Sequence, residues 1–293
     1  MTQINYSFII PHKNCPDLLV RCINSIPSRE DIQIIVVDDN SDTDKKPSIH
    51  RRDVEVVYLD DKQSRGAGKA RNVGLEKAIG KWLLFPDADD FYEKGFLNEL
   101  DKFVDTSFDI VFFDIFCAIN LETGECWKND YSNFLQQFVN HPQSDCLAKS
   151  VKHARTEAWH QMYSHKFIKS LDVQFHELPS CNDAWFTQYS ASKTSNISGI
   201  NKKLYYWVRN PKGLTNSKHK VNYYRKKEKE LLVIKKLKAE QSAWNVITPF
   251  WSGLGGLKQR EGLLMALRVL FIRLGNGWIE WQIVWHKLAK NNK

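Results

Sequence analysis

The residues best suited to chemistry in this sequence are the aspartates of the segment Asp87-Ala88-Asp89-Asp90. An extended segment points residues two apart in the same direction, so Asp87 and Asp89 can converge on one ligand. Carboxylate oxygens are the ligands that Mg²⁺ and Mn²⁺ prefer. A cation held there could bind a nucleoside diphosphate and stabilise the charge that develops when the diphosphate departs. The alternative is a solvated acidic turn in which Asp90 caps a helix.

A second acidic pair, Asp38-Asp39, also follows an apolar run. Residues 32–37 predict a strand that ends at Asp38, as residues 82–86 predict one that ends at Asp87. In open α/β sheets, ligands bind beyond the carboxyl ends of the strands. Both acidic clusters are therefore expected at a ligand site, although Asp38 and Asp39 could instead form a turn with local side-chain hydrogen bonds.

The elements that must position these clusters alternate along the chain. Apolar runs predict strands, and apolar residues at helical spacing predict helices. Strands that alternate with helices favour a mostly parallel sheet. Proline cannot extend a central strand, so the first strand is expected to end at Pro11. The predicted strands span residues 3–10, 32–37, 54–59, 82–86, 109–116 and 204–208, and the predicted helices span 17–26, 68–79, 96–103 and 222–241.

Four segments in order make the sequence similar to a known family. They are Phe8-Ile9-Ile10-Pro11, Ile35-Val36-Val37-Asp38-Asp39-Asn40-Ser41, Gly66-Ala67-Gly68-Lys69-Ala70-Arg71-Asn72-Val73-Gly74 and Leu84-Phe85-Pro86-Asp87-Ala88-Asp89-Asp90. Residues 4–115 resemble the nucleotide-binding half of the family-2 inverting glycosyltransferases of GT-A fold. The resemblance implies a Rossmann-like α/β fold, with a mostly parallel central sheet flanked by helices and a C-terminal helical extension.

The resemblance also implies a division of the chain and a nucleotide site. Residues 1–116 would bind the nucleotide-sugar, 117–217 would form the acceptor-binding half of the same domain, and 218–293 would be a basic, amphipathic helical extension. Pro11 and Asp39 would line the nucleobase pocket. Arg71 would contact the base or ribose and brace the aspartate loop; otherwise it is an ordinary charge on a helix surface.

The same resemblance assigns the phosphate side of the site. Asp87 would bind ribose and metal-linked water, Ala88 would lie against the donor, and Asp89 would ligate Mn²⁺ or Mg²⁺. Arg209 and the stretch Lys212–His219 resemble the loop that closes over the diphosphate in this family, or are a plain surface loop. Arg65 could also reach the phosphates.

Proton chemistry requires a further carboxylate, which takes the proton of the attacking hydroxyl. The family usually carries a Glu-Asp pair for this purpose, and this sequence has Asn182-Asp183. Asp183 matches the general base, and Glu177 is the second candidate. Asp183 could also cap the helix that follows it. Trp159 and Trp185 could stack on acceptor sugars, although core packing is the commoner role of tryptophan.

The net charge of +8 belongs to the C-terminal segment. Residues 218–293 hold 16 Lys and Arg against 5 Asp and Glu, whereas residues 1–217 hold 26 against 29. Apolar stripes within 257–274 and 278–290 favour binding to an anionic membrane surface through 257–290. The alternatives are internal packing or a homodimer. Nucleic acid is not an expected partner, since no recognition motif accompanies the lysines. Residues 263–274 are predicted to form an apolar stripe on one helix face. Three arginines lie outside this stripe: Arg260, Arg268 and Arg273.

The resemblance, together with the basic tail, implies an inverting glycosyltransferase of the hexosyltransferase type. By the same resemblance it would move a sugar from a nucleotide-sugar donor, UDP-linked, to a saccharide or lipid-linked saccharide acceptor in bacterial surface polysaccharide synthesis. Its expected place is the cytoplasm, on the inner face of the cytoplasmic membrane. The alternatives are a nucleotidyltransferase of related fold, whose Gly-rich N-terminal signature is missing after the first strand, and a non-catalytic sugar-nucleotide-binding or scaffold protein.

Overall fold

The computed structural model describes most of the chain. The described residues are 3–59, 66–126, 130–178, 181–209, 221–241, 254, 257–258 and 263–275. Four predicted features lie outside them: Arg65, the Lys212–His219 loop, Arg260 and the helix over 278–290.

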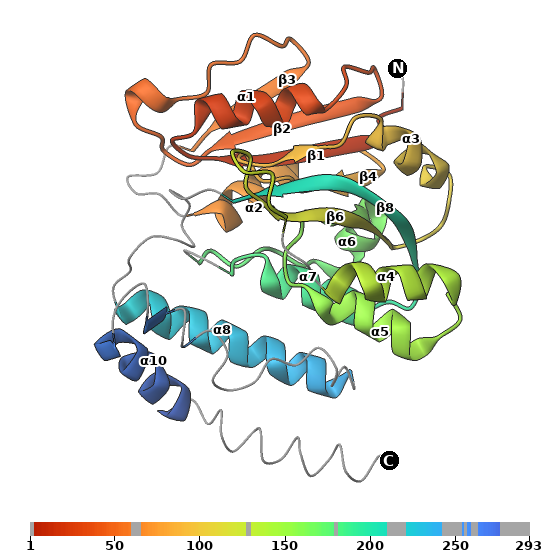
Figure 1. Cartoon of the computed structure of the whole chain (residues 1–293). Coiled ribbons are helices and arrows are strands. Elements are labelled where there is room, and N and C mark those ends of the chain that lie inside the picture. The colour runs from red at the N-terminus through yellow and green to blue at the C-terminus, as the bar shows by residue number, and fades with distance from the viewer. Residues whose placement is uncertain are drawn as a thin grey trace.

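One mixed sheet of eight strands forms the centre of the described chain, in the order β3-β2-β1-β4-β7-β6-β8-β5 (Figure 1). β1 is parallel to β2 and β4, β2 to β3, and β6 to β8, while β7 runs antiparallel between β4 and β6 and β5 pairs antiparallel with β8. The predicted mostly parallel α/β sheet is confirmed. The strands are β1 Tyr6–His12, β2 Ile32–Asp38, β3 Val54–Tyr58, β4 Trp82–Leu84, β5 Phe91–Tyr92, β6 Ile110–Ile119, β7 Gln161–Ser164 and β8 Ile197–Val208.

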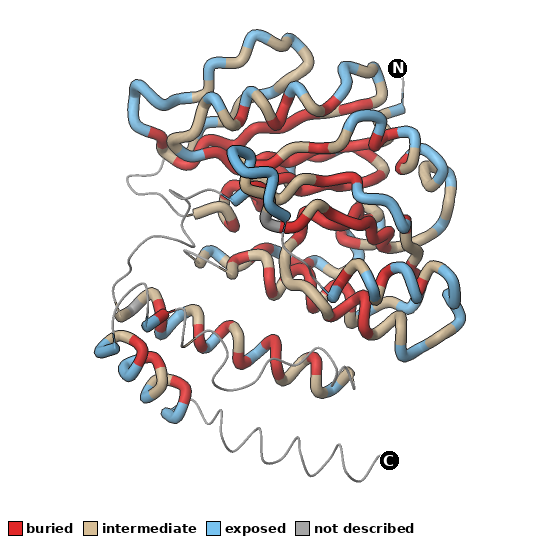
Figure 2. The backbone as a smooth tube through the Cα atoms, in the orientation of Figure 1, coloured by how far each residue is buried: buried red, intermediate tan, exposed pale blue. Residues whose placement is uncertain are grey.

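Helices cover both faces of this sheet. α2 packs on β1 and β2, and α4 packs on β6 and β8. The buried residues concentrate along the central strands (Figure 2). The helices are α1 Pro16–Ser25, α2 Ala67–Lys77, α3 Phe96–Leu100, α4 Asp130–Asn140, α5 Asp145–Ala154, α6 His165–Leu171, α7 Ala184–Ser192, α8 Val221–Glu240 and α10 Leu263–Gly275, with short 3₁₀ turns η1 Thr43–Lys45 and η2 Asp101–Phe103.

β1 does not end at Pro11 as predicted. It runs on to His12, and Pro11 lies in register with Val37 of β2. Pairing with β4 on the other side of β1 stops at Phe8, opposite Leu84. The missing N–H of Pro11 therefore removes no bond to β4, which explains why a proline is tolerated in this strand.

The C-terminal helices form a packed pair against the sheet domain. α8 packs on α7, and α10 packs on α8. Arg273 of α10 is buried and donates from Nε to a carboxylate oxygen of Glu228 of α8 at 2.7 Å. Arg273 lies outside the apolar stripe, as predicted, but it is buried, because the ion pair with Glu228 places it on the face of α10 that packs on α8. None of the described helices is long and apolar enough to cross a membrane.

Candidate functional site

The aspartate loop that follows β4 is held by side chains and backbone from three other elements. A carboxylate oxygen of Asp87 accepts a hydrogen bond from Arg71 of α2 at 2.5 Å. The backbone N–H of Asp87 donates to the hydroxyl of Tyr205 in β8 at 2.9 Å. Arg21 of α1 donates to the backbone carbonyl of Asp89 at 2.5 Å. These contacts fix the position of the loop at the carboxyl end of β4.

Asp90 does not cap a helix, because strand β5 follows it. Its buried carboxylate accepts hydrogen bonds from the backbone N–H of Val208 at 2.7 Å and from the Tyr205 hydroxyl at 2.9 Å. Burial, followed by the nearby carboxylates of Asp89 and Asp87, raises the pKa of Asp90 well above its ordinary value. Asp90 thus fastens the loop to β8.

Asp87, Asp89 and Asp90 could together hold a metal ion, since one carboxylate oxygen from each lies within 4.8 Å of the others. An all-oxygen set of this kind suits a hard divalent cation such as Mg²⁺ or Mn²⁺. Asp90 is buried and both its oxygens accept hydrogen bonds within the fold, whereas Asp87 and Asp89 are partly exposed, so the ligand role falls to Asp87 and Asp89. The donor set therefore fits the predicted cation.

The first aspartate of the second acidic pair has a structural role. Asp38 accepts from the Ser41 hydroxyl at 2.6 Å and lies 2.7 Å from Nδ1 of His12. The backbone N–H of Cys15 donates to Nε2 of the same imidazole at 3.3 Å. These bonds assign the neutral tautomer in which Nδ1–H donates to Asp38. Asp38 therefore holds the loops after β1 and β2 together.

Asp39 ties the end of β2 to the start of α2. Its carboxylate accepts from the backbone N–H of Gly66 at 2.8 Å, and its own N–H donates to the His12 carbonyl at 2.9 Å. Gly66 has φ of 87°, a conformation that glycine adopts without strain. Pro11, buried next to His12, lies at the same sheet edge. The structure thus brings Pro11 and Asp39 together where the nucleobase pocket is predicted.

Arg71 joins the aspartate loop to the segment that carries Asp183. One guanidinium nitrogen donates to Asp87, and the other donates to the side-chain oxygen of Asn182 at 2.6 Å. The guanidinium is buried and lies over the ring of Phe175, 5.4 Å from its centroid. Asn182, which stands where the family usually has glutamate, anchors Arg71 through a neutral amide.

Asp183 lies directly before α7, but its side chain makes no capping hydrogen bond. Asp183 thus occupies the N-cap position, but its side chain does not cap the helix. Burial raises the pKa of Asp183 to about 7; Arg71 opposes this shift, while Glu157 and Asp87 add to it. A carboxylate with such a pKa can exchange a proton near neutral pH. Glu177, the second candidate, forms an ion pair with Lys69 at 3.9 Å.

Close contacts between α2 and residues 172–183 were not foreseen from the sequence. Asn72 donates to the Phe175 carbonyl at 2.9 Å and accepts from the Phe175 N–H at 2.8 Å. A Cβ on Gly68 would lie 2.1 Å from the His176 carbonyl oxygen, so only glycine fits there. A contact between residues about a hundred positions apart leaves no periodic pattern in the sequence.

The remaining predicted residues divide between core and surface. Trp159 is buried and stacks on Tyr205 and Trp207, which makes it a core residue and not a platform for an acceptor. Trp185 is half-buried and stacks between His176 and Tyr189. Arg209 is exposed, and its N–H donates to the Ile119 carbonyl at 2.9 Å.

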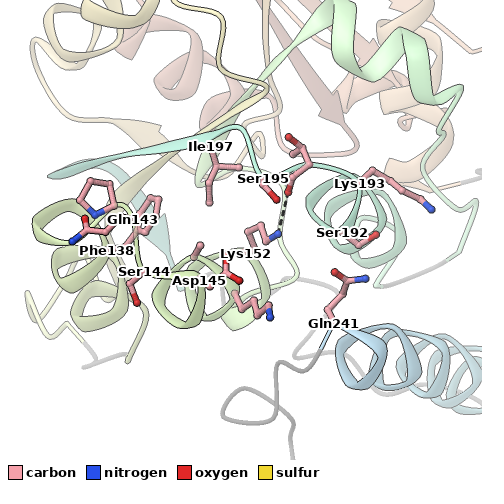
Figure 3. A pocket seen from close by; sticks show the side chains of 14 residues that line it. Phe138, Gln143, Ser144, Asp145, Lys152, Ser192, Lys193, Ser195, Ile197 and Gln241 are labelled. Atoms are coloured by element: carbon pink, nitrogen blue, oxygen red, sulfur yellow. Dashed lines mark hydrogen bonds between the residues drawn. The ribbon is translucent and has the colours of Figure 1, made fainter.

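A separate pocket of about 280 Å³ lies between α5, the end of α7 and the end of α8 (Figure 3). The ammonium of Lys152 donates to the Thr194 carbonyl there at 3.0 Å. None of the aspartates described above lines this pocket, so it is distinct from the predicted donor site.

Comparison with known proteins gives the chain clear relatives. The family model "Glycosyl transferase family 2" matches residues 7–161. Poly(ribitol-phosphate) beta-N-acetylglucosaminyltransferase TarS of Staphylococcus aureus is 25% identical over 221 residues, covering 72% of this chain and 36% of TarS. UDP-Glc:alpha-D-GlcNAc-diphosphoundecaprenol beta-1,3-glucosyltransferase WfaP of Escherichia coli is 31% identical over 103 residues, covering 34% of this chain and 41% of WfaP.

A solved structure shares the fold. S. aureus TarS 1–349 in complex with UDP-GlcNAc superposes with a TM-score of 0.66 at 20% identity, covering 92% of this chain and 79% of that chain. The predicted GT-A fold is confirmed by this likeness. The chain spans only about a third of the full-length TarS and less than half of WfaP.

Proposed function

The chain belongs to glycosyl transferase family 2, and from this we propose that it is an inverting glycosyltransferase that uses a UDP-linked sugar. The observation that carries the proposal is the bridge made by Arg71, which holds Asp87 and Asn182 at once and so sets the aspartate loop beside Asp183. The proposed donor-binding residue Asp87 and the proposed base Asp183 are thereby held by the same set of contacts around Arg71. The family membership favours this reading over the nucleotidyltransferase and scaffold alternatives.

Asp183 is the proposed general base. Its carboxylate takes the proton of an acceptor hydroxyl while that oxygen forms a bond to the anomeric carbon of the donor sugar. The bond from this carbon to the diphosphate breaks on the opposite side, so the configuration inverts. A pKa of about 7, raised mainly by burial, makes Asp183 a stronger base than an exposed aspartate while leaving much of it ionised near neutral pH.

The donor is proposed to bind between the two acidic strand ends. Pro11 and Asp39 would contact the base, and Arg71 would keep Asp87 in place. Asp87 and Asp89 would hold Mn²⁺ or Mg²⁺, which would supply positive charge to the departing diphosphate. Ala88, buried between them, is the side chain proposed to touch the donor, and Arg209 would approach the phosphates from the end of β8.

The acceptor is proposed to be a saccharide or lipid-linked saccharide of the bacterial surface. TarS is named for a poly(ribitol-phosphate) acceptor, and WfaP for a sugar joined to diphosphoundecaprenol. An acceptor of the second kind would place the enzyme on the inner face of the cytoplasmic membrane. Residues 1–116 and 117–217 are proposed as the donor and acceptor halves of one domain.

The C-terminal extension is proposed to bind an anionic membrane surface. One face of α10 packs on α8, and its other face exposes large apolar side chains, which are Leu263, Leu264, Leu267, Phe271 and Leu274. The exposed basic residues Arg225, Lys226 and Lys229 of α8 and Arg268 of α10 belong to the same helix pair. Apolar side chains together with cationic ones suit the interface of an anionic bilayer.

The proposed function is tested by donor binding and turnover. Wild-type protein with Mn²⁺ should bind UDP-GlcNAc or UDP-glucose and slowly hydrolyse the preferred donor. Asp89→Ala should weaken metal-dependent donor binding at least about tenfold, because a cation ligand is lost. Exposed Asp105, which pairs with Lys81 on the surface, gives the control Asp105→Ala. If neither donor binds in the presence of metal, or Asp89→Ala behaves as the control does, the proposal is wrong.

A further inference from the structure

An ion pair between Arg155 and Glu157 stands in the segment that leads into β7. Arg155 donates to one carboxylate oxygen of Glu157 at 2.8 Å, and the backbone N–H of Thr156 donates to the other at 3.0 Å. The guanidinium lies 5.0 Å from the ring centroid of Trp159 and 5.3 Å from that of Trp207. Arg155 is therefore locked in place by two indole rings, and it holds the Glu157 carboxylate in one orientation.

The topology places this pair at the edge of the sheet that carries the aspartate loop. β7 runs antiparallel to β4, so the residues just before β7 lie beside the carboxyl end of β4. Packing agrees, since Trp159 stacks on Tyr205 at 5.2 Å between centroids, and the Tyr205 hydroxyl accepts from the Asp87 N–H. Glu157 is thus connected to Asp87 through successive contacts of Arg155, Trp159 and Tyr205.

The pair is also joined to α7, which begins after Asp183. Gln188 of α7 donates to the Arg155 carbonyl, and its side-chain oxygen lies 2.8 Å from Nδ1 of His153. Gln188 follows Asp183 by little more than one helical turn. The carboxylate of Glu157 is near enough to both Asp87 and Asp183 that it helps to raise the pKa of each.

The charge of Glu157 is maintained by its surroundings. Burial works to raise its pKa, but Arg155 and then His160 hold the pKa below its ordinary value. From α8, the buried Lys238 faces the same carboxylate; burial lowers the pKa of Lys238 to about 8, and Glu157 opposes that shift. About a third of the Glu157 side chain remains exposed, at 31%. The Glu157 carboxylate is therefore partly exposed, ionised and held in one orientation.

We propose that Glu157 binds hydroxyl groups of the transferred sugar and helps to determine which donor sugar is accepted. This inference rests on the proposed function. The transferred sugar must lie between the diphosphate, near Asp87, and the base, Asp183. A carboxylate that neighbours both of these groups borders that space. Ionised carboxylates form strong hydrogen bonds with sugar hydroxyls, and a fixed orientation makes such bonds selective.

The test compares UDP with UDP-sugars on the full chain in Mn²⁺. Calorimetry would give affinities for UDP, UDP-GlcNAc and UDP-glucose with wild type, Glu157→Gln and Glu157→Ala. Both variants should bind UDP within about twofold of wild type, yet lose about tenfold or more in affinity for the preferred UDP-sugar, as expected when a hydrogen bond to a charged group is removed. Their preference between the two sugars should shrink.

Glu99→Gln is a matched control, because Glu99 is also a partly buried carboxylate with cationic partners, Lys102 and Lys202. A parallel loss of affinity for UDP and UDP-sugar in the Glu157 variants would assign Glu157 a structural role and overturn the inference. Unchanged affinity for all three ligands would overturn it as well. If wild type binds UDP but gains nothing from the sugar, the inference fails while a nucleotide site survives; if it binds none of them, the proposed function fails too.

Discussion

Asp183 combines two influences that act in opposite directions on its proton. Burial favours the neutral acid, and the Arg71 guanidinium favours the carboxylate. Arg71 donates hydrogen bonds to Asp87 and Asn182. These bonds hold its guanidinium charge in a fixed position. The balance leaves Asp183 with a pKa of about 7, within the range in which a general base is effective.

A pH dependence follows for the transfer rate. The base must be ionised to accept a proton, so the rate at saturating donor and acceptor should rise with pH and level off above about 7, the pKa of Asp183. Below that value it should fall about tenfold per pH unit. Initial rates between about pH 5 and 8.5 would show this limb. Donor affinity, measured over the same range, should lack it; a rate that does not change with pH would contradict the assignment.

The sequence predicted some of the site residues but not the contacts that hold them. Asp183, Asp87 and Asp89 belong to sequence motifs that indicate their chemical roles. The anchoring role of Asn182 and the clamping of Arg155 between Trp159 and Trp207 depend on contacts between distant segments. No local pattern encodes such contacts.

At the scale of elements, α2 determines where the base segment lies. Gly68, Arg71 and Asn72 occupy neighbouring turns of this helix, and each contacts residues 172–183. The Gly-rich segment that resembles a nucleotide-binding motif is therefore also the docking surface for the loop before Asp183. Its glycine is required by close approach of the His176 carbonyl.

Gly68→Ala should accordingly damage both stability and activity. The new methyl group would meet a backbone carbonyl at 2.1 Å, so the loop must move. We expect a loss of about 1–3 kcal/mol in the free energy of unfolding, as for other overpacked sites. The transfer rate should also fall at temperatures where the variant is folded. Urea unfolding and initial rates would measure the two effects.

Gly275→Ala provides the control, since a Cβ on Gly275 would meet no atom within 4 Å. It should leave both quantities near the wild-type values. A Gly68→Ala variant as stable and active as this control would show that α2 does not position the base segment.

The sequence predicted the alternating strands and helices better than the pairing of the strands in the sheet. Apolar runs in the sequence indicated β1, β2, β3 and β4. Strand β7 was not, because Gln161–Ser164 is only four residues long and mixes polar with apolar side chains. It lies antiparallel between β4 and β6, and this position brings the Arg155–Glu157 pair to the edge of the site.

For the whole molecule, α8 packs beside the sheet domain and α10 packs on α8 (Figure 1). The Glu228–Arg273 ion pair and the buried Val269 orient α10, so that its other face is exposed. His176, before the base, lies 3.0 Å from Glu230 of α8. The extension is thus packed against the segment that carries Asp183, and the sequence alone did not indicate this contact.

Membrane binding through α10 predicts a specific loss. Replacing Leu267 and Phe271 by serine should weaken binding of the full chain to phosphatidylglycerol vesicles by about tenfold or more, because two apolar side chains no longer leave water. Phe271 is 68% exposed, and Ile79 on the sheet domain is 67% exposed, so Ile79→Ser is a matched control. Co-sedimentation would measure the effect. Equal binding of all three proteins, or a dimer that the double substitution disrupts without affecting vesicle binding, would contradict the membrane proposal.

Asp183→Asn tests most directly whether one frame of contacts holds a donor site and a separate base. The amide preserves the shape of the side chain but cannot take a proton. With the preferred UDP-sugar, Mn²⁺ and an accepted saccharide, the transfer rate should fall about 10²- to 10⁴-fold, while donor affinity measured by calorimetry stays within about twofold of wild type. Transfer at the wild-type rate would place the base elsewhere, and loss of donor binding in step with the rate would contradict the separation of the two roles.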